Sequence, residues 1–351
     1  MNTNELVSAI ELLNRHAKGE RDFAGALLLR ANFSGMNLNR TNLREAVLKK
    51  ANFSGASLVA ANLSNADLYK ANFCGAILID ANLSKANLMA ANLMNADLSG
   101  CSLGGAILTG ANLAKSTMVS ASLVGADLRT AVLEEALLMG ASLSRAILSE
   151  VKGKNAKLNR AILSEADLSG SDFSGAMMIR ASLSRCNLQQ ANLADIDLSE
   201  ADLRSCNLSG ANLSGANLRG ANLTGTILKD AILRGADLRG CNFSGSDLSG
   251  LLLSGADLNG AEMTRADLRS CNLSGASLAG ANLLEADLAD ANLRFCNLSG
   301  AGLLLAYLCG ADLSGANLTG ANLIGAKLAD ACLSGALLDG AVLPNGRTHS
   351  S

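Results

Sequence analysis

The chain has 351 residues, with 29 basic and 31 acidic side chains and a formal net charge of −2. A balance so close to neutral excludes a strongly basic nucleic-acid-binding protein, and the absence of Trp with only two Tyr removes the aromatic platforms on which bases stack. No run approaches the roughly 18–20 apolar residues of a membrane helix, so neither nucleic acid nor a membrane is an expected partner.

Residues 1–20 are predicted to form an N-terminal capping helix. Asn2 or Thr3 can cap a helix over residues 4–17. We expect one apolar face of that helix to cover the first coil of the repeats that follow, and a separate partner-binding helix is the alternative. The segment lacks the basic and apolar regions of a signal peptide, so the expected location is cytoplasmic. The residues of the apolar face are Leu6, Ile10, Leu13 and Ala17.

From Phe23 to Leu343, every fifth residue is apolar with one exception. Of these 65 positions, 55 are Leu, six are Phe, three are Met and one is Gly153, and the residue two places earlier is usually Ala. Residues two apart in an extended segment face the same side, so the Ala and the Leu point inward together and the Asn or Asp between them points outward. The fourth and fifth residues must turn a corner, where Gly supplies positive φ at no steric cost.

A chain that turns inward every five residues closes into a coil. Four sides make one coil of 20 residues, so residues 21–345 are predicted to form an all-β solenoid, a quadrilateral parallel β-helix of about 16 coils. Residues 20 apart should stack on successive coils. Four inward leucines fill each cross-section, so we expect no cofactor and no metal inside. Residues 346–351 are predicted to be a C-terminal tail.

One repeat departs from the pattern, at residues 151–155 with the sequence VKGKN. Gly153 replaces the inward leucine there, so we expect a bulge or a loosened corner. Glu134 lies 20 residues before Lys154 and should pair with it. A basic anion site built from this repeat with Lys157, Arg160 and Arg180 is the alternative.

The cysteines and histidines favour a passive interior over catalysis. His16 and His349 are the only histidines, so no histidine-based catalytic triad can assemble and no catalytic residue is expected. Cys186 and Cys206 should stack, which would permit a disulfide or a shared metal, although inert buried thiols are favoured. No cysteine pair has zinc-site spacing. Six cysteines occupy the inward Ala position: Cys101, Cys186, Cys206, Cys241, Cys271 and Cys296.

Apolar residues at outward positions predict protein-contact surfaces, with scattered drift of the repeat as the alternative. On the first side, Leu284, Leu304 and Ile324 form a column near the C-terminus, and Tyr307 lies on the neighbouring side. The last coil has only a short tail over it, so we expect a homodimer through the C-terminal coils. A further column on the fourth side consists of Val59, Ile79, Val119, Met139 and Ile179.

Runs such as ANLSG ANLRG ANLTG at residues 211–225 resemble the pentapeptide-repeat family, whose signature is A(D/N)LXX, and especially its cyanobacterial members. The resemblance covers residues 21–345 and implies a right-handed quadrilateral β-helix that acts as a non-catalytic scaffold or regulator. Some family members mimic duplex DNA and inhibit DNA gyrase, which is the alternative function. Such mimicry needs a continuous negative face. Three aspartates on the second side form a short acidic column, but Arg269 and Lys229 interrupt the area around it. The members of the column are Asp247, Asp267 and Asp287.

Overall fold

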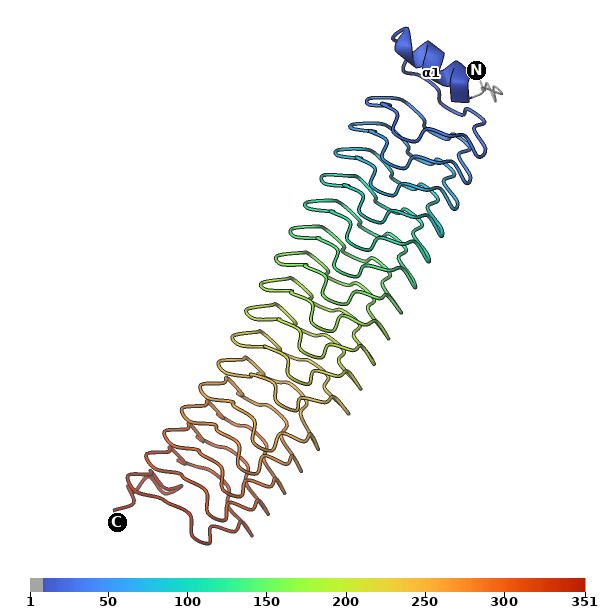
Figure 1. Ribbon diagram of the computed structural model, residues 1–351. Coiled ribbons are helices and arrows are strands. Elements are labelled where there is room, and N and C mark those ends of the chain that lie inside the picture. Colours follow the sequence, from blue (N-terminus) through green and yellow to red (C-terminus); the bar gives the residue numbers. More distant parts are fainter. Residues whose placement is uncertain (1–8, 351) are drawn as a thin grey trace. The chain divides into compact units, whose positions relative to one another are not determined.

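A computed structural model describes residues 9–350, which fall into two compact units, here called unit 1, up to Met177, and unit 2, from Met178 (Figure 1). The single helix of the described residues is α1, Ala9–Ala17. Apart from one antiparallel bridge near the C-terminus, the bridges of the described residues are parallel and join residues 20 apart, from Asp22↔Asn42 to Lys157↔Met177 in unit 1 and from Ser182↔Asp202 to Asn322↔Val342 in unit 2. Each unit is therefore a stack of four-sided coils, as the period of five predicts.

Backbone hydrogen bonds explain why the repeat stacks in this register. In unit 1, the Leu63 amide donates to the Asn82 carbonyl of the next coil at 2.7 Å, and the Asn82 amide donates back to the Ala61 carbonyl at 2.9 Å. The Ala66 amide donates to the Leu63 carbonyl at 3.1 Å across the corner. Each side thus satisfies its buried backbone groups with its two neighbouring coils and its own turn.

The corner requires a left-handed backbone at the fifth position even where the residue is not glycine. Ala60 has φ 54° and Lys50 has φ 58°, the same region that Gly55 adopts at φ 63°. The side chain at the second position supports the turn, since the amide of Ser54 donates to Asn52 Oδ1 at 3.1 Å. Because the same asparagine is also bonded by Asn72 of the next coil at 3.1 Å, this residue type joins the coils as well as the corners.

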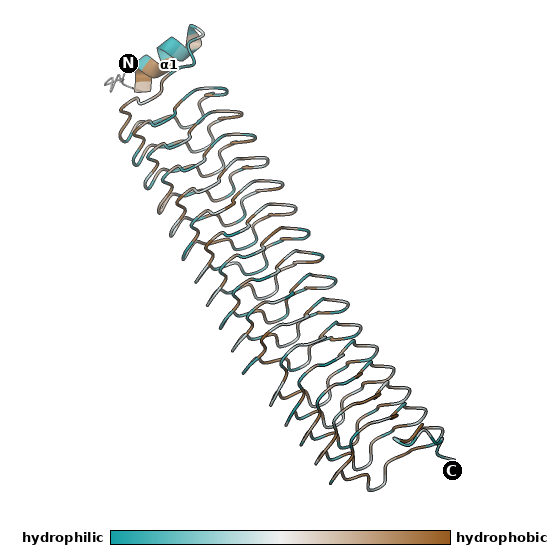
Figure 2. Ribbon diagram, turned by 180° about the vertical axis from the view of Figure 1, so that it is seen from behind, coloured by the Kyte–Doolittle hydropathy of each residue, from teal (hydrophilic) through white to brown (hydrophobic). Residues whose placement is uncertain are grey.

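The core lies on the axis of each unit. The inward Leu, Phe and Ala side chains are buried through most coils, while polar residues alternate with them along the chain (Figure 2). Phe33, Phe53 and Phe73 stack with ring centroids 5.1 and 4.7 Å apart. Each buried large side chain contributes about 1.5–3 kcal/mol, which repetition multiplies along the axis. The predicted inward positions are therefore confirmed.

Helix α1 lies at the N-terminal end of unit 1 (Figure 1), but its predicted apolar face is only partly right, since Leu13 alone of its described members is half-buried. Ile10 is 74% exposed and Ala17 is exposed, whereas Leu12, which the sequence pattern left out, is fully buried. Arg15 lies over the Phe23 ring at 5.3 Å, so the face that contacts the first coil contains Leu12 and Arg15. The predicted members at residues 1–8, Leu6 among them, fall outside the described residues.

The expected bulge at residues 151–155 is also wrong. The Gly153 amide donates to the Asp172 carbonyl at 2.7 Å, and the Lys152 amide donates to the Ala131 carbonyl at 3.0 Å, so the ladder is continuous. A Cβ at Gly153 would lie 2.3 Å from the ring of Phe173, which stacks 20 residues later. The larger Phe173 ring therefore fills the space that the missing leucine leaves.

The ion pair predicted at this repeat is not made within unit 1. No ion pair joins Glu134 to Lys154 in the described chain, and Lys115 instead pairs with Glu135 at 3.7 Å. Lys152, Lys154 and Lys157 are all exposed. The repeat is therefore regular in backbone and basic on its surface.

The ladder opens at one place in unit 2 that the sequence reasoning did not single out. Leu251 occupies the inward position that is Ala231 one coil earlier, and it is 4% exposed. The bonds that would join Leu233 to Leu252 and Gly235 to Ser254 are missing, and so is the bridge between Ile232 and Leu252. The bonds from Leu228 to Asp247 and from Asp230 to Ser249 on the second side are missing as well, so these coils are separated along both sides, next to a leucine that needs more space than an alanine.

The C-terminal coil of unit 2 has a less buried interior than the coils before it. Leu328, Leu333 and Leu338 hold the inward position but are partly exposed. Residues 341–350 fold back over one side, where Val342 pairs with Thr348 in an antiparallel bridge. The other three sides of this coil keep an open β-edge within the described chain.

Candidate protein-contact surfaces

The predicted column on the fourth side is less exposed than its sequence indicates. Val59, Ile79, Val119 and Met139 all lie in unit 1 and are half-buried, and Ile179 is half-buried in unit 2. The fourth residue of each repeat leans over its corner, so its neighbours in the stack cover part of it. On the same side, Met36 and Ile77 present large apolar side chains to solvent, at 43% and 42% exposure.

The second predicted surface, at the C-terminal coils of unit 2, is more open. Leu284 and Leu304 are half-buried, whereas Ile324 is 40% and Tyr307 is 42% exposed. The amide of Leu305 donates to the Ile324 carbonyl at 2.9 Å, and Leu305 itself is 46% exposed. The corner between the first and second sides therefore carries three exposed apolar side chains on neighbouring coils.

Two aromatic side chains of unit 2 are held by cations from the same surface. Lys327 Nζ lies 4.4 Å from the centroid of the Tyr307 ring, and the Arg294 guanidinium lies 5.5 Å from that of Phe295. Phe295 is 66% exposed and lies over Gly315, which has no side chain to displace it. The sequence reasoning missed Phe295, although it is the one phenylalanine outside the inward positions.

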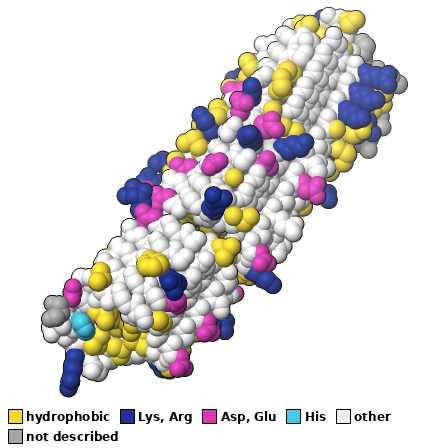
Figure 3. Space-filling view, turned by 60° about the horizontal axis from the view of Figure 1, so that its bottom comes forward, with side chains coloured by type: hydrophobic (Ala, Val, Ile, Leu, Met, Phe, Trp, Pro, Cys, Tyr) yellow, Lys and Arg dark blue, Asp and Glu magenta, His cyan; other side chains and the backbone are white. Residues whose placement is uncertain are grey.

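The end of unit 2 adds an apolar patch to this region, here called the end patch. Its members are the partly exposed inward leucines Leu328, Leu333 and Leu338. In Figure 3 hydrophobic side chains gather beside a histidine at this end. Exposed apolar area that continues around an edge is the usual character of a protein-contact surface.

The three aspartates of the acidic column stack as the repeat predicts, but a neighbouring arginine offsets part of their negative charge. Asp247, Asp267 and Asp287 stack through successive bridges. Arg269 Nη2 lies 2.6 Å from Asp267 Oδ2, and its Nε lies 3.8 Å from Asp287 Oδ2. The hydrogen bond from Arg269 holds the pKa of Asp267 below its ordinary value. The predicted interruption by Arg269 is confirmed, since one cation faces two of the three carboxylates.

The six cysteines at the inward Ala position of the repeat are buried, as that position predicts. All nine are free thiols, so Cys186 and Cys206 form no disulfide, and both are buried. Cys206 Sγ donates to the Leu183 carbonyl at 2.9 Å, a bond that Cys101 repeats with Leu78 at 2.8 Å. Burial raises the pKa of the Cys101 thiol to about 12. Residues 9–350 contain no group of three or more Cys, His, Asp or Glu side chains placed to hold a metal ion.

Comparisons with solved structures find similar repeat proteins. HetL, a pentapeptide repeat protein involved in heterocyst differentiation regulation from Nostoc sp. strain PCC 7120, is 36% identical over 68% of this chain and 91% of its own, with a TM-score of 0.22. Rfr23 from Cyanothece 51142 is 42% identical over 24% of this chain and 58% of its own, with a TM-score of 0.24.

A third structure is that of QnrB1, a plasmid-mediated fluoroquinolone resistance protein. It is 22% identical over 56% of this chain and 88% of its own, with a TM-score of 0.32. A comparison with curated proteins gives no match. None of the described helices has the length and apolar character needed to cross a membrane.

The family comparison rests on the repeats themselves. A family model described as pentapeptide repeats, in eight copies, matches overlapping segments that run from residues 26–65 to residues 304–342. These segments contain the inward leucines, the stacked second positions and the left-handed corners of both units. The fold of this family, a right-handed quadrilateral β-helix, is the fold of each unit. The chain belongs to the pentapeptide repeat family.

Proposed function

We propose that this protein is a non-catalytic scaffold or regulator that acts through protein contacts. The observation that carries the proposal is the end patch, together with the exposed side chains of Leu305, Tyr307 and Ile324 beside it. The interior supports it, because inward side chains fill the axis of each unit and leave the surface for recognition. The nine free thiols favour a reducing compartment, so we place this role in the cytoplasm.

A second copy of the chain is the partner that we assign to the end patch. The amides of Leu328, Leu333 and Leu338 and the carbonyls of Ala331 and Ala336 have no backbone partner in the described chain. The same edge on a second copy offers matching donors and acceptors and the same apolar residues. Two-fold contacts between identical patches close into a dimer.

The charges around the edge support this choice. Lys327 and Arg347 lie near the edge with Asp330 and Asp339, so the rim carries both signs in equal number. Two copies can approach without a net repulsion, and each basic group has acidic groups to meet on the other copy. Because the charges of the rim balance, this edge would not attract a partner with a strong net charge.

Molar mass measured by light scattering at micromolar concentration tests the dimer. We expect the full chain to be a dimer and Leu333→Glu to be a monomer, because a carboxylate in the end patch would be buried unpaired in the interface. Val124→Glu, at a position of unit 1 that is 41% exposed, is the matched control and should stay dimeric. A monomeric full chain, or a Leu333→Glu variant that remains dimeric, contradicts the proposal.

A DNA-mimicking modulator of DNA gyrase is the second candidate function. The stacked carboxylates of Asp247, Asp267 and Asp287 favour it, and the position of Arg269 opposes it. A supercoiling assay separates the candidates. Inhibition that is lost when the three aspartates are changed to asparagine supports mimicry, and no inhibition at micromolar protein excludes it.

A further inference from the structure

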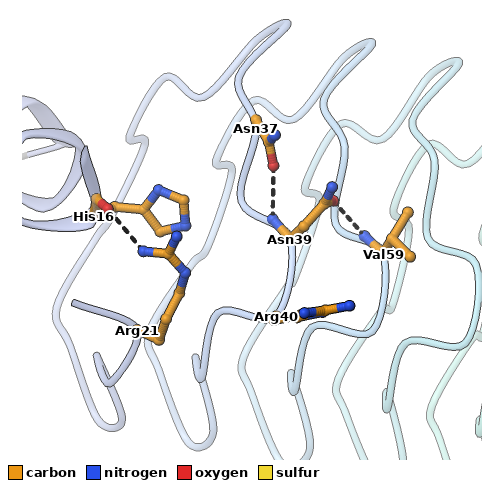
Figure 4. A pocket seen from close by; sticks show the side chains of 6 residues that line it. All are labelled: His16, Arg21, Asn37, Asn39, Arg40 and Val59. Atoms are coloured by element: carbon orange, nitrogen blue, oxygen red, sulfur yellow. Dashed lines mark hydrogen bonds between the residues drawn. The ribbon is translucent and has the colours of Figure 1, made fainter. Parts of the chain in front are cut away.

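An open cavity of about 530 Å³ lies where α1 meets the first coils of unit 1 (Figure 4). The residues that line it come from the end of α1, from the start of the first coil and from the fourth side. Its volume falls within the range of small-molecule sites. The lining residues are His16, Arg21, Asn37, Asn39, Arg40 and Val59.

Internal hydrogen bonds already use the acceptors of this cavity. Asn37 Oδ1 accepts the Asn39 amide at 3.0 Å, and Asn39 Oδ1 accepts the Val59 amide at 2.8 Å (Figure 4). Asn39 Oδ1 also accepts Ser57 Oγ at 2.7 Å. The carbonyl of His16 accepts Arg21 Nη1 at 2.7 Å. These bonds fix both amide groups with their oxygens turned to protein donors.

The groups that remain are donors. The amide nitrogens of Asn37 and Asn39 make no hydrogen bond within the described residues, and Arg40 has neither a side-chain hydrogen bond nor an ion pair there. Arg21 uses only Nη1, which leaves its other nitrogens available. His16 Nε2 is buried without a partner. No lining residue is acidic, so the cavity offers two guanidinium groups and two amides with no competing carboxylate.

We infer that this cavity binds a small tetrahedral oxyanion, a phosphate or sulfate group, with Arg21 and Arg40 as its cationic donors. Guanidinium groups match the geometry of such oxyanions and bond them with more than one nitrogen. The amide nitrogens of Asn37 and Asn39 would complete the set of donors. The volume leaves room for a small organic group attached to the anion.

His16 reports on the site without being needed to hold the anion. Burial, and then the Arg21 charge beside it, hold the pKa of His16 below its ordinary value. Figure 4 shows its imidazole next to the Arg21 guanidinium. Two other charged groups of this segment, Arg15 and Glu20, pair with each other at 2.6 Å. An anion beside Arg21 would offset the Arg21 charge, so the pKa of His16 should rise when it binds.

Proton NMR of the histidine rings in the untagged full chain tests the inference, because only His16 and His349 contribute. We expect sodium sulfate, compared with sodium chloride at equal ionic strength, to shift the His16 signals and raise its pKa. His349 should not respond. Sulfate is the probe because its charge stays constant over the pH range in which histidine titrates.

Arg40→Gln should weaken sulfate binding by about tenfold or more, since a hydrogen-bonded charge is lost. Gln190 adopts φ 56° at an equivalent corner, so the substitution fits the backbone. Arg30→Gln is the matched control: Arg30 is exposed two corners earlier with φ 56° and should leave binding unchanged. Equal shifts of His16 and His349, no shift, or an Arg40→Gln variant with full binding overturns the inference.

Inorganic phosphate and glycerol phosphate at equal concentration then distinguish the source of the anion. Tighter binding of the ester supports an organic phosphate that uses the rest of the cavity. Equal binding supports a free anion. Binding of neither ester nor inorganic phosphate counts against the inference.

Discussion

At the scale of single residues, an irregular residue in one coil is compensated by the residue that stacks on it 20 positions away. Gly153 removes an inward leucine, and the Phe173 ring occupies the space where a side chain at Gly153 would lie. The pair keeps the volume of the core nearly constant, which is why the ladder stays closed from Leu133 through Gly153 to the coil of Phe173.

Gly153→Leu should lower the stability of unit 1 by about 1–3 kcal/mol, because its side chain would collide with the Phe173 ring. Phe173→Leu alone should also destabilise, since it leaves a cavity beside Gly153. The double variant restores the consensus at both positions, and its thermal midpoint should return close to that of the native chain. Additive losses in the double variant would show that the two residues do not share one space.

Thiol labelling measures the difference between inward and outward cysteines. Burial raises the pKa of Cys241 and Cys296 to about 12, so at neutral pH they carry no thiolate and should not react with a disulfide reagent. Cys332 is exposed, and its pKa is lowered by hydrogen bonds with Ser314 and Ser334, so it should react first. Cys332→Ser should remove the fast phase. Native labelling of the six inward cysteines at neutral pH would contradict their burial.

At the scale of one coil, the neighbouring coils separate at Leu251, whereas Val151 at the same inward position of the repeat leaves its ladder closed. Leu251 occupies a position that is Ala in most repeats, and the third side loses its bonds between Leu233 and Leu252. The segment around Leu251 should unfold locally more readily than the rest of unit 2, because the free energy of local opening depends on the hydrogen bonds and packing of each segment.

Hydrogen exchange followed by mass spectrometry or NMR tests this weak point. In Leu251→Ala we expect the amides of Leu233, Gly235 and Leu252 to exchange at least about tenfold more slowly, because the coils can close and form the missing bonds. Leu252→Ala, at a side chain that is 74% exposed, is the control and should leave exchange unchanged. Unchanged or faster exchange in Leu251→Ala would mean that another feature separates the coils.

The sequence predicted the coils well because a period of five constrains every side in the same way. The inward leucines, the corners and the 20-residue register follow from alternation and turn chemistry. Compensation at Phe173 and separation at Leu251 were both visible as departures in the sequence, but their consequences depend on which residue lies one coil away. Helix α1 was less predictable, since a short helix on a curved edge buries Leu12 rather than the regular face that contains Ile10.

At the scale of the whole molecule, two units share one repeat and differ in what their surfaces expose. The apolar column that contains Val59 and Met139 is half-buried, while Tyr307, Leu305 and the end patch are open in unit 2. Residue type alone could not distinguish these surfaces, because exposure at the fourth and fifth positions depends on neighbours in the stack. The contact surface was therefore only partly predictable.

The central claim is that side chains at every fifth position share a closed apolar axis and that their immediate neighbours face water. Leu123 is fully buried and Val124 is 41% exposed, so one substitution can be placed on either side of that boundary. Thermal unfolding of Leu123→Asp and Val124→Asp, followed by circular dichroism, compares them directly. We predict that Leu123→Asp loses more than about 4 kcal/mol through a buried, unpaired carboxylate, and that Val124→Asp stays within about 0.5 kcal/mol of the native chain. Equal losses in the two variants would contradict the account.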